Sequence, residues 1–373
     1  MQQPPGFINF TLSSHVCWLH KSLYGLKQAP WAWYTHLSDY LFSIGFCASK
    51  IDSSLFILFI GADIFYLLVY VDDILLTGSN SALLHRLIQL LSSEFKLQDL
   101  GAVHYFFGIE VHPTSMSFYK LVDTPISTSK VTVMLNCLFS DPTQFRQIIG
   151  AFQYLTFIRP DIYFAINKVC QFMDALTDTY WAAVKCILCY LKGMISFGLH
   201  ITRNSSFALH SFTDVNWAGS IDDRKFTGGY LVFFGNTLIS WKSSKQRTVT
   251  RSSIKTKYKV LANDTAGVLW LQYLLSDMQI TPTSTFMPTI WCDNLDTTYL
   301  SANSVFHICM KHVEVDYYFL CNRVAKKDIH IQFISFNDQL VDVLTKPLST
   351  TFITFRFKLR VDPRPLTWGT CTI

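Results

Sequence analysis

Apolar residues in the first third of the chain occur at two spacings that together predict an α+β domain. Between residues 31 and 46 they recur every three or four positions, as on the core-facing side of a helix that Gly45 ends. Strand-length apolar runs follow at residues 54–60, 64–71 and 74–77, and helical spacing returns over residues 80–95. Helices that alternate with antiparallel hairpins are typical of an α+β domain, which we expect to end near residue 120.

Beyond residue 140 the pattern changes twice. Helical spacing dominates residues 142–157, 161–174 and 179–192 and predicts a helical section. Strands and helices then alternate from residue 207 onward. We expect strands at residues 207–213, 229–234, 237–241, 289–292 and 329–334, with helices at 252–276, 311–325 and 337–344. That order predicts a compact domain with a mixed sheet.

Composition agrees with a folded chain. Of the 373 residues, 50% are hydrophobic and 15% are charged, which is too apolar for a disordered protein. The longest apolar run, residues 55–71, is interrupted at Gly61-Ala62-Asp63, so we expect no membrane span and no membrane partner. The start of the chain lacks the basic and apolar order of a signal peptide, and the ten cysteines are scattered. We therefore expect an intracellular protein, cytoplasmic or nuclear.

Two adjacent carboxylates, Asp72 and Asp73, stand between apolar runs. Burying them there would be costly, and a β-hairpin that carries both at its tip avoids that cost. A pair of carboxylates at a hairpin tip can bind Mg²⁺, the cation that handles phosphates. The alternative is an ordinary aspartate-rich turn.

Acidic residues also occur at the ends of elements in the last block of the chain. Asp214 follows the first expected strand, Asp293 follows residues 290–292, and Asp342 opens the last helix. Three carboxylates that converge from distant elements would form an Mg²⁺ site for phosphodiester hydrolysis. The alternative is that these are solvated strand ends.

A basic segment lies between these acids. Residues 242–259 contain seven lysines and arginines, among them Lys245 and Arg247, and no acid. Such a segment can bind phosphate groups without sequence specificity. The net charge of +5 permits a nucleic-acid partner without demanding one.

Several motifs occur in the order found in one known family. They are Lys-Ser-Leu-Tyr-Gly-Leu-Lys-Gln-Ala-Pro with Ala-Trp-Tyr in residues 21–34, Tyr-Val-Asp-Asp at 70–73, residues 99–111, Arg-Pro-Asp at 159–161, Thr-Asp-Val-Asn-Trp-Ala-Gly at 213–219, Cys-Asp-Asn at 292–294, Lys-His at 311–312 and Asp-Val-Leu-Thr-Lys-Pro at 342–347. Residues 1–348 thereby resemble the reverse transcriptase and ribonuclease H region of the copia-type LTR-retrotransposon Pol polyproteins.

The resemblance implies an α+β and α/β multidomain fold. Residues 1–122 would form a truncated polymerase palm, and residues 123–205 a helical remnant of the thumb and connection. Residues 206–348 would form a ribonuclease H-like domain with a mixed five-stranded sheet, followed by a tail over residues 349–373.

The resemblance also assigns roles to the acidic residues. Asp72 and Asp73 match the catalytic pair of the polymerase, while Asp214, Asp293 and Asp342 match three of the four acids of the ribonuclease H centre. Each site would use Mg²⁺, and the implied partner is an RNA/DNA hybrid or another nucleic acid. Residues 21–34, including Lys21, Lys27 and Gln28, match the segment that positions template and nucleotide. The oligomeric state stays open.

The fourth acid of the ribonuclease H centre is absent. The family's Ser-Ser-Ala-Glu-Ala-Glu-Tyr corresponds to residues 252–258, where Lys257 stands in place of the metal-binding glutamate and Lys255 in place of the other glutamate. An ammonium group has no lone pair to offer Mg²⁺ and repels it.

The family's palm also uses an aspartate N-terminal to the segment that corresponds to residues 3–7, and this sequence begins at Met1. We therefore expect a truncated, inactive remnant of an RNA-directed DNA polymerase with a ribonuclease H domain. Two alternatives stay open, an active reverse transcriptase as part of a longer chain, or a non-catalytic nucleic-acid-binding module.

Overall fold

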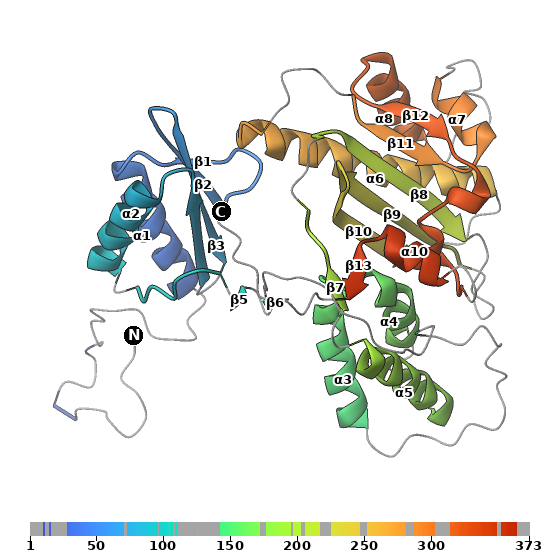
Figure 1. Cartoon of the computed structure of the whole chain (residues 1–373), viewed down its shortest axis with the longest axis horizontal. Coiled ribbons are helices and arrows are strands. Elements are labelled where there is room, and N and C mark those ends of the chain that lie inside the picture. The colour runs from blue at the N-terminus through green and yellow to red at the C-terminus, as the bar shows by residue number, and fades with distance from the viewer. Residues whose placement is uncertain are drawn as a thin grey trace. The chain divides into compact units, whose positions relative to one another are not determined.

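The computed structural model divides into two compact units, Met1–Phe107 and Gly108–Ile373, which Figure 1 colours from blue to red along the chain. The structure describes residues 10–11, 15, 28–70, 73–95, 97–103, 105–106, 109–110, 125, 142–171, 177–194, 197–202, 206–216, 225–246, 252–280, 287–302, 314–348 and 352–363. Helices and strands occur in both units, as the sequence predicts. No helix among these residues is long and apolar enough to cross a membrane.

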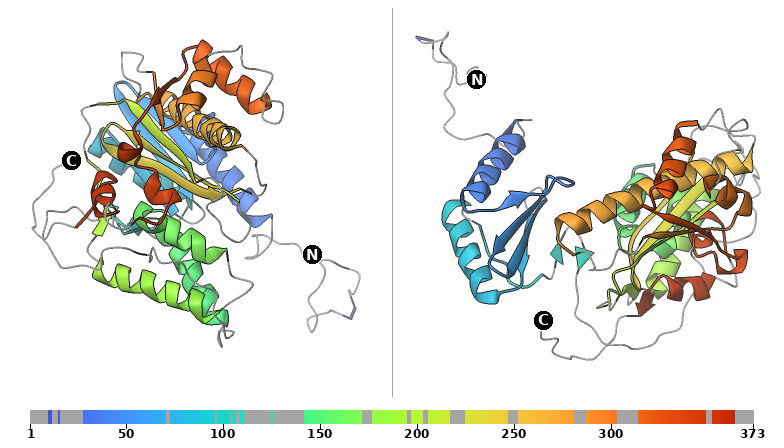
Figure 2. Two further views of the ribbon diagram at one scale, coloured as in Figure 1. Left: turned by 90° about the vertical axis from the view of Figure 1, so that its right-hand side faces the viewer. Right: turned by 90° about the horizontal axis from the view of Figure 1, so that it is seen from above.

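The N-terminal unit is an antiparallel sheet with two helices on one face. The strands are β1 (Cys47–Ala48), β2 (Leu55–Ile60), β3 (Asp63–Tyr70) and β4 (Asp73–Gly78), in the order β1-β2-β3-β4. Helices α1 (Ala29–Ser43) and α2 (Ser81–Phe95) pack on the sheet, as Figure 2 shows in blue and cyan. Leu37 and Leu91 from the helices share a buried core with Phe56 and Phe65 from the strands.

Local sequence explains the ends of these elements. Asn80 caps α2, because its side-chain oxygen accepts hydrogen bonds from the backbone N–H groups of Ala82 and Leu83. The turn between β2 and β3 contains Gly61, whose φ of 63° is disfavoured for residues with a side chain. Two short strands follow, β5 (Tyr105–Phe106) and β6 (Ile109–Glu110).

The C-terminal unit is built on a five-stranded mixed sheet of order β10-β9-β8-β11-β12. Its strands are β8 (Leu209–Asn216), β9 (Thr227–Phe234), β10 (Thr237–Lys245), β11 (Thr289–Cys292) and β12 (His330–Phe333). The hairpins β8–β9 and β9–β10 are antiparallel, whereas β11 runs parallel to both β8 and β12. β8 is therefore the central strand and joins the two kinds of pairing.

Helices cover both faces of this sheet (Figure 1). On one face, α6 (Ser253–Asp277) and α8 (Glu314–Ala325) enclose a core with Leu209, Val232 and Ile290 of the strands. The other face packs against α3 (Pro142–Leu155), α4 (Tyr163–Cys170), α5 (Asp178–Gly193), α9 (Asp342–Thr345) and α10 (Phe352–Lys358). α7 (Leu295–Ala302) follows β11, and β7 (Phe197–Leu199) pairs with β13 (Val361–Pro363).

Two segments are less separate than the sequence suggests. The described part of residues 123–205 shares one hydrophobic core with the sheet, because Phe145, Ile166 and Val184 pack with Leu231 of β9. Residues 352–363, expected in a tail, bury Phe355 in that same core. The buried residues Phe352, Phe355 and Leu359 recur every three or four positions, so one side of α10 faces this core.

The expected helix over residues 337–344 is instead two short turns. The first turn is the 3₁₀ helix η4 (Phe336–Asp338), and the second is α9, which begins only at Asp342. Another 3₁₀ helix, η1 (Pro160–Ile162), precedes α4. Gln339 between η4 and α9 is extended, with ψ of 97°. Its fully buried side chain donates a hydrogen bond of 3.0 Å to the carbonyl of Thr213. The break in the helix thus lets the Gln339 amide reach the central strand.

Candidate active site

Asp214 lies on the central strand β8, within the strand and not after it as the sequence suggested. Only 2% of the residue is exposed. Its cross-strand neighbour is Gly229, where an added Cβ would lie 3.1 Å from Val341 Cγ1 and 3.2 Å from Thr345 Cγ2. The missing side chain lets α9 approach, and the Thr345 hydroxyl donates a hydrogen bond of 3.2 Å to Asp214 Oδ2.

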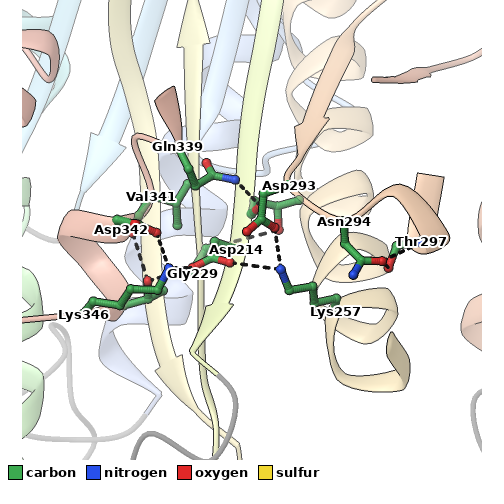
Figure 3. A network of polar contacts seen from close by, with 12 residues as sticks. Asp214, Gly229, Lys257, Asp293, Asn294, Thr297, Gln339, Val341, Asp342 and Lys346 are labelled. Atoms are coloured by element: carbon green, nitrogen blue, oxygen red, sulfur yellow. Dashed lines mark hydrogen bonds and ion pairs between the residues drawn. The ribbon is translucent and has the colours of Figure 1, made fainter. Parts of the chain in front are cut away.

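Lys257, in the second turn of α6, joins two of the carboxylates. Its Nζ lies 2.5 Å from Asp293 Oδ1 and 3.6 Å from Asp214 Oδ1. Figure 3 shows the Lys257 side chain directed toward both acids. Asp293 directly follows β11, which is parallel to β8 in the sheet. The Lys257 side chain is 16% exposed, so the ion pair is mostly shielded from water.

Lys346 joins Asp214 to the third carboxylate. Its Nζ lies 3.1 Å from Asp214 Oδ2 and 2.7 Å from Asp342 Oδ1, and 4.5 Å from the ring centre of Phe336. Asp342 is the first residue of α9 and Lys346 directly follows its last, so the single helical turn between them brings the two side chains together. Two ammonium groups therefore hold the three expected acids together (Figure 3).

Burial raises the pKa values of the three acids, whereas the lysines lower them. Burial would raise the pKa of Asp214, but the nearby ammonium groups of Lys346 and Lys257 outweigh it and lower that pKa. At Asp342, burial is the largest effect, and the charge of Asp214 adds to it. Together they outweigh Lys346 and raise the pKa of Asp342 to about 7. Burial and Asp214 likewise raise the pKa of Asp293 despite Lys257.

The arrangement does not suit the divalent metal that the acids alone would suggest. Carboxylate oxygens are good ligands for Mg²⁺, but in this centre they already surround the ammonium groups of Lys257 and Lys346. A divalent cation in the same space would meet two positive charges at short range. Among the described residues, no group of three or more histidine, cysteine and acidic side chains is arranged to hold a metal ion.

The other expected site residues are only partly described. Asp73 is exposed and is the first residue of β4, paired with Tyr70 across the β3–β4 hairpin. It therefore lies at the tip of that hairpin. Asp72, Lys21, Lys27 and Arg247 lie outside the described residues.

Gln28 of the template segment and Lys245 of the basic segment are described, each in its own unit. Gln28 is exposed, and its carbonyl accepts a hydrogen bond from the backbone of Ala32 at the start of α1. Lys245 ends β10 and donates a hydrogen bond of 2.8 Å to the side chain of Gln171.

Sequence reasoning missed the part that Lys346 plays. The residue stood in a recognised motif, but its charge was not connected with Asp342 and Asp214. Its spacing of four residues from Asp342 was a usable signal, because an acid and a base at that spacing often pair. The approach of Lys346 to Asp214 could not be read locally, since 132 positions separate the two in the chain.

Comparisons with known proteins identify the class of the chain. Residues 1–132 match the family model described as "Reverse transcriptase (RNA-dependent DNA polymerase)". The retrovirus-related Pol polyprotein from transposon RE1 of Arabidopsis thaliana is 43% identical over 98% of this chain. An uncharacterized mitochondrial protein of the same plant is 42% identical over 55% of this chain and 93% of its own length.

A likeness among solved structures is weaker. One match is to LC11-RNase H1, isolated from compost by a metagenomic approach. The match covers 36% of this chain and 88% of the LC11 chain, with 9% sequence identity and a TM-score of 0.29. A similarity of that size supports no conclusion about function.

The class that emerges is a reverse transcriptase-related protein with an acidic centre in its C-terminal unit. More particularly, the chain belongs to the copia-type retrotransposon Pol polyproteins. It spans about a quarter of the length of the first relatives, 26% of the RE1 polyprotein and 27% of the RE2 polyprotein.

Proposed function

We propose that the chain is the reverse transcriptase and ribonuclease H part of a Pol polyprotein, and that its ribonuclease H centre does not cleave RNA. In this proposal residues 1–122 belong to the polymerase palm, residues 123–205 to the thumb and connection, and residues 206–348 to the ribonuclease H domain. The proposal rests on one observation above all, the ion pairs of Lys257 with Asp214 and Asp293.

Both the position and the charge of Lys257 argue against RNA hydrolysis at the acidic centre. Magnesium ions, when bound to such acids, would stabilise the developing charge on the phosphate and activate water. Here the negative charges of Asp214 and Asp293 are compensated by Lys257, so the acids have less charge to offer a metal. Lys257 also lacks the oxygen ligands that a glutamate would contribute at this place.

Lys257 is the residue to test, and not Lys346. The motif at residues 342–347 matches the family with its lysine in place, whereas Lys257 departs from the family pattern. Lys257→Glu would remove the ammonium group and add a carboxylate in one substitution. Lys255→Glu is the matched control, because it makes the same charge change two residues away on the same helix.

The experiment measures cleavage of the RNA strand in an RNA–DNA hybrid with Mg²⁺. We expect no cleavage by the unmodified chain or by Lys255→Glu, and measurable cleavage by Lys257→Glu, a gain of orders of magnitude if metal positioning is what the centre lacks. Adding Asp293→Asn to Lys257→Glu should abolish the gain. Equal cleavage by the unmodified chain and Lys257→Glu would refute the proposal.

For the N-terminal unit we propose the polymerase role that the family implies. Asp73 at the exposed hairpin tip supports it, because the carboxylate is open to a ligand. We place activity in the longer polyprotein, where Asp73→Asn should reduce primer extension. Unchanged extension by that variant would contradict the assignment.

A second candidate function, binding of nucleic acid without catalysis, is favoured by a basic groove. The groove lies between α6 and the edge strand β10, has a volume of about 710 Å³ and is lined by Lys242, Lys245 and Lys259. Such lysines would bind backbone phosphates in a salt-dependent manner. Replacing Lys242 and Lys259 by alanine should weaken binding of a labelled hybrid and lower its salt dependence, by a slope of about one for each phosphate that is no longer bound.

A further inference from the structure

A second pocket lies on the face of the five-stranded sheet that points away from α6. Ser211 of β8 is hydrogen-bonded to Asp264 of α6, so His210 and Phe212, its neighbours in the strand, project to the opposite face. Both line a pocket of about 390 Å³. That volume lies in the range of about 300–1,000 Å³ typical of small-molecule sites.

Aromatic side chains from three neighbouring strands form its floor. Phe212 of β8 is directly opposite Trp291 of β11, and the two rings are stacked, with centres 6.4 Å apart and planes 19° apart. Phe233 of β9 meets Phe212 edge to face at 5.8 Å. Trp291 and Phe212 are only partly buried. The flat surface that they present is therefore open to a ligand.

Basic side chains lie at the edge of this floor. Lys358 is the last residue of α10 and is exposed, and Arg360 follows two residues later. The backbone of Arg360 has a φ of 62°, an uncommon value for a residue with a side chain. Gln279 after α6 and Lys327 after α8 have similar values, so this is how the helices of this unit end, and it places Arg360 directly beyond α10.

We propose that this pocket binds one nucleotide of a single nucleic-acid strand, with its base on Trp291 and Phe212 and its phosphate at Lys358 and Arg360. Every base has a flat π-face that stacks on aromatic side chains. Lysine and arginine are the usual partners of phosphate. Burial lowers the pKa of His210, which leaves a neutral imidazole that can donate to and accept from a base edge.

This site goes beyond the proposed function, because none of its residues belongs to the acidic centre and binding requires no hydrolysis. The pocket combines a stacking surface with positive charge. We therefore expect that neither the nucleoside alone nor the sugar phosphate alone binds as tightly as the whole nucleotide. Isothermal titration of the full chain with adenosine 5′-monophosphate, adenosine and ribose 5-phosphate tests this directly. We expect the nucleotide to bind more tightly than either fragment by on the order of tenfold, and a short single-stranded oligonucleotide to compete with it.

Variants place the binding in this pocket. Trp291→Leu should weaken nucleotide binding by on the order of tenfold, with Trp270→Leu, a tryptophan on α6 that is 44% exposed, as its control. Lys358→Glu, at an exposed position that leaves the fold intact, should weaken the nucleotide but not adenosine, with Lys326→Glu as its control.

Three results would overturn the proposal. One is that the nucleotide does not bind, and another is that ribose 5-phosphate binds as tightly as the nucleotide. The third is that Trp291→Leu and Lys358→Glu bind the nucleotide like the unmodified chain. None of these measurements uses Mg²⁺ or Lys257, so their failure would leave the proposal for the acidic centre untouched.

Discussion

Lys257 and Asp264 lie two turns apart on α6. The charge of Lys257 is paired with opposite charges, whereas Asp264 is buried beside an uncharged hydroxyl. The Lys257 ammonium group is compensated by two carboxylates. The Asp264 carboxyl is fully buried and faces a hydroxyl, because Ser211 Oγ lies 2.6 and 2.7 Å from its two oxygens. Ser211 Oγ also lies 3.1 Å from the carbonyl of Leu231. One hydroxyl proton cannot serve three acceptors, so the geometry favours a protonated Asp264 that donates to Ser211.

This protonation predicts a specific pH dependence of stability. Burial is the main effect at Asp264 and raises its pKa to about 8, against about 3.9 for aspartate in an unfolded chain. The folded state then binds more protons than the unfolded state between these values, and the free energy of unfolding falls as pH rises from about 4 to about 8. Asp264→Asn should remove this part of the slope, because asparagine stays neutral and can donate to Ser211.

Urea unfolding of the two proteins across this pH range checks the prediction. Asp296→Asn, at an exposed aspartate, is the control and should retain the slope of the unmodified chain. The same slope in Asp264→Asn and in the unmodified chain would contradict a protonated Asp264.

Single residues were predictable where a motif or a strand end marked them. Asp214, Asp293 and Asp342 stood at such places, and the structure joins them through lysines. Asp264 was not marked, because a helical pattern indicates a buried side without naming the hydroxyl that a buried acid will meet. That partner, Ser211, comes from a strand 53 positions earlier.

At the scale of elements, α10 depends on a clear division between buried and exposed aromatic residues. Phe355 is 6% exposed and belongs to the core beneath the sheet, whereas Phe357 is 45% exposed. Phe355→Ala should lower the free energy of unfolding by about 3–5 kcal/mol, since it opens a cavity in a packed core. Phe357→Ala should change it far less. Chemical denaturation measures both, and similar losses would show that α10 is not docked as described.

The strands and long helices were predictable because their apolar spacing persists over many residues. The predicted helix 252–276 is α6, Ser253–Asp277, and the predicted strand 289–292 is β11. The predicted helix 337–344 failed because the buried Gln339 amide bonds to β8, a tertiary contact that no local spacing reveals. The sequence predicts a tail over residues 349–373 for a similar reason, because the described residues 352–363 pack against a core that distant segments form.

At the scale of the C-terminal unit, one buried ion pair holds the parts of the helical section together, and the core of that section continues into the sheet. Arg159 donates to both oxygens of Asp161 at 2.9 and 2.7 Å, and the Tyr190 hydroxyl donates to Asp161 Oδ2 at 2.7 Å. Arg159 also donates to the carbonyl of Met194 at 3.3 Å, after the end of α5. The same core continues without interruption into β9 and β10.

Because the helical section and the sheet share a core, they should unfold together. Asp161→Asn leaves the charge of Arg159 buried and unpaired, which typically costs about 3–5 kcal/mol. Hydrogen exchange should then show lower protection in β8 and β9 as well as in α4 and α5. A loss confined to α4 and α5 would mean that residues 142–194 form a separate folding unit. Tyr154→Phe, at a residue that is 67% exposed, is the control and should leave both regions unchanged.

The central claim is that lysine takes the place of metal in the acidic centre, and Mg²⁺-dependent stability tests it most directly. The melting temperature of the unmodified chain and of Lys257→Glu is measured with and without Mg²⁺, with Lys255→Glu as control. A ligand that binds only the folded state raises its stability, so Mg²⁺ should raise the melting temperature of Lys257→Glu more than that of the other two proteins. The added shift should disappear with Asp293→Asn. An equal Mg²⁺ shift in the unmodified chain and in Lys257→Glu would contradict the account.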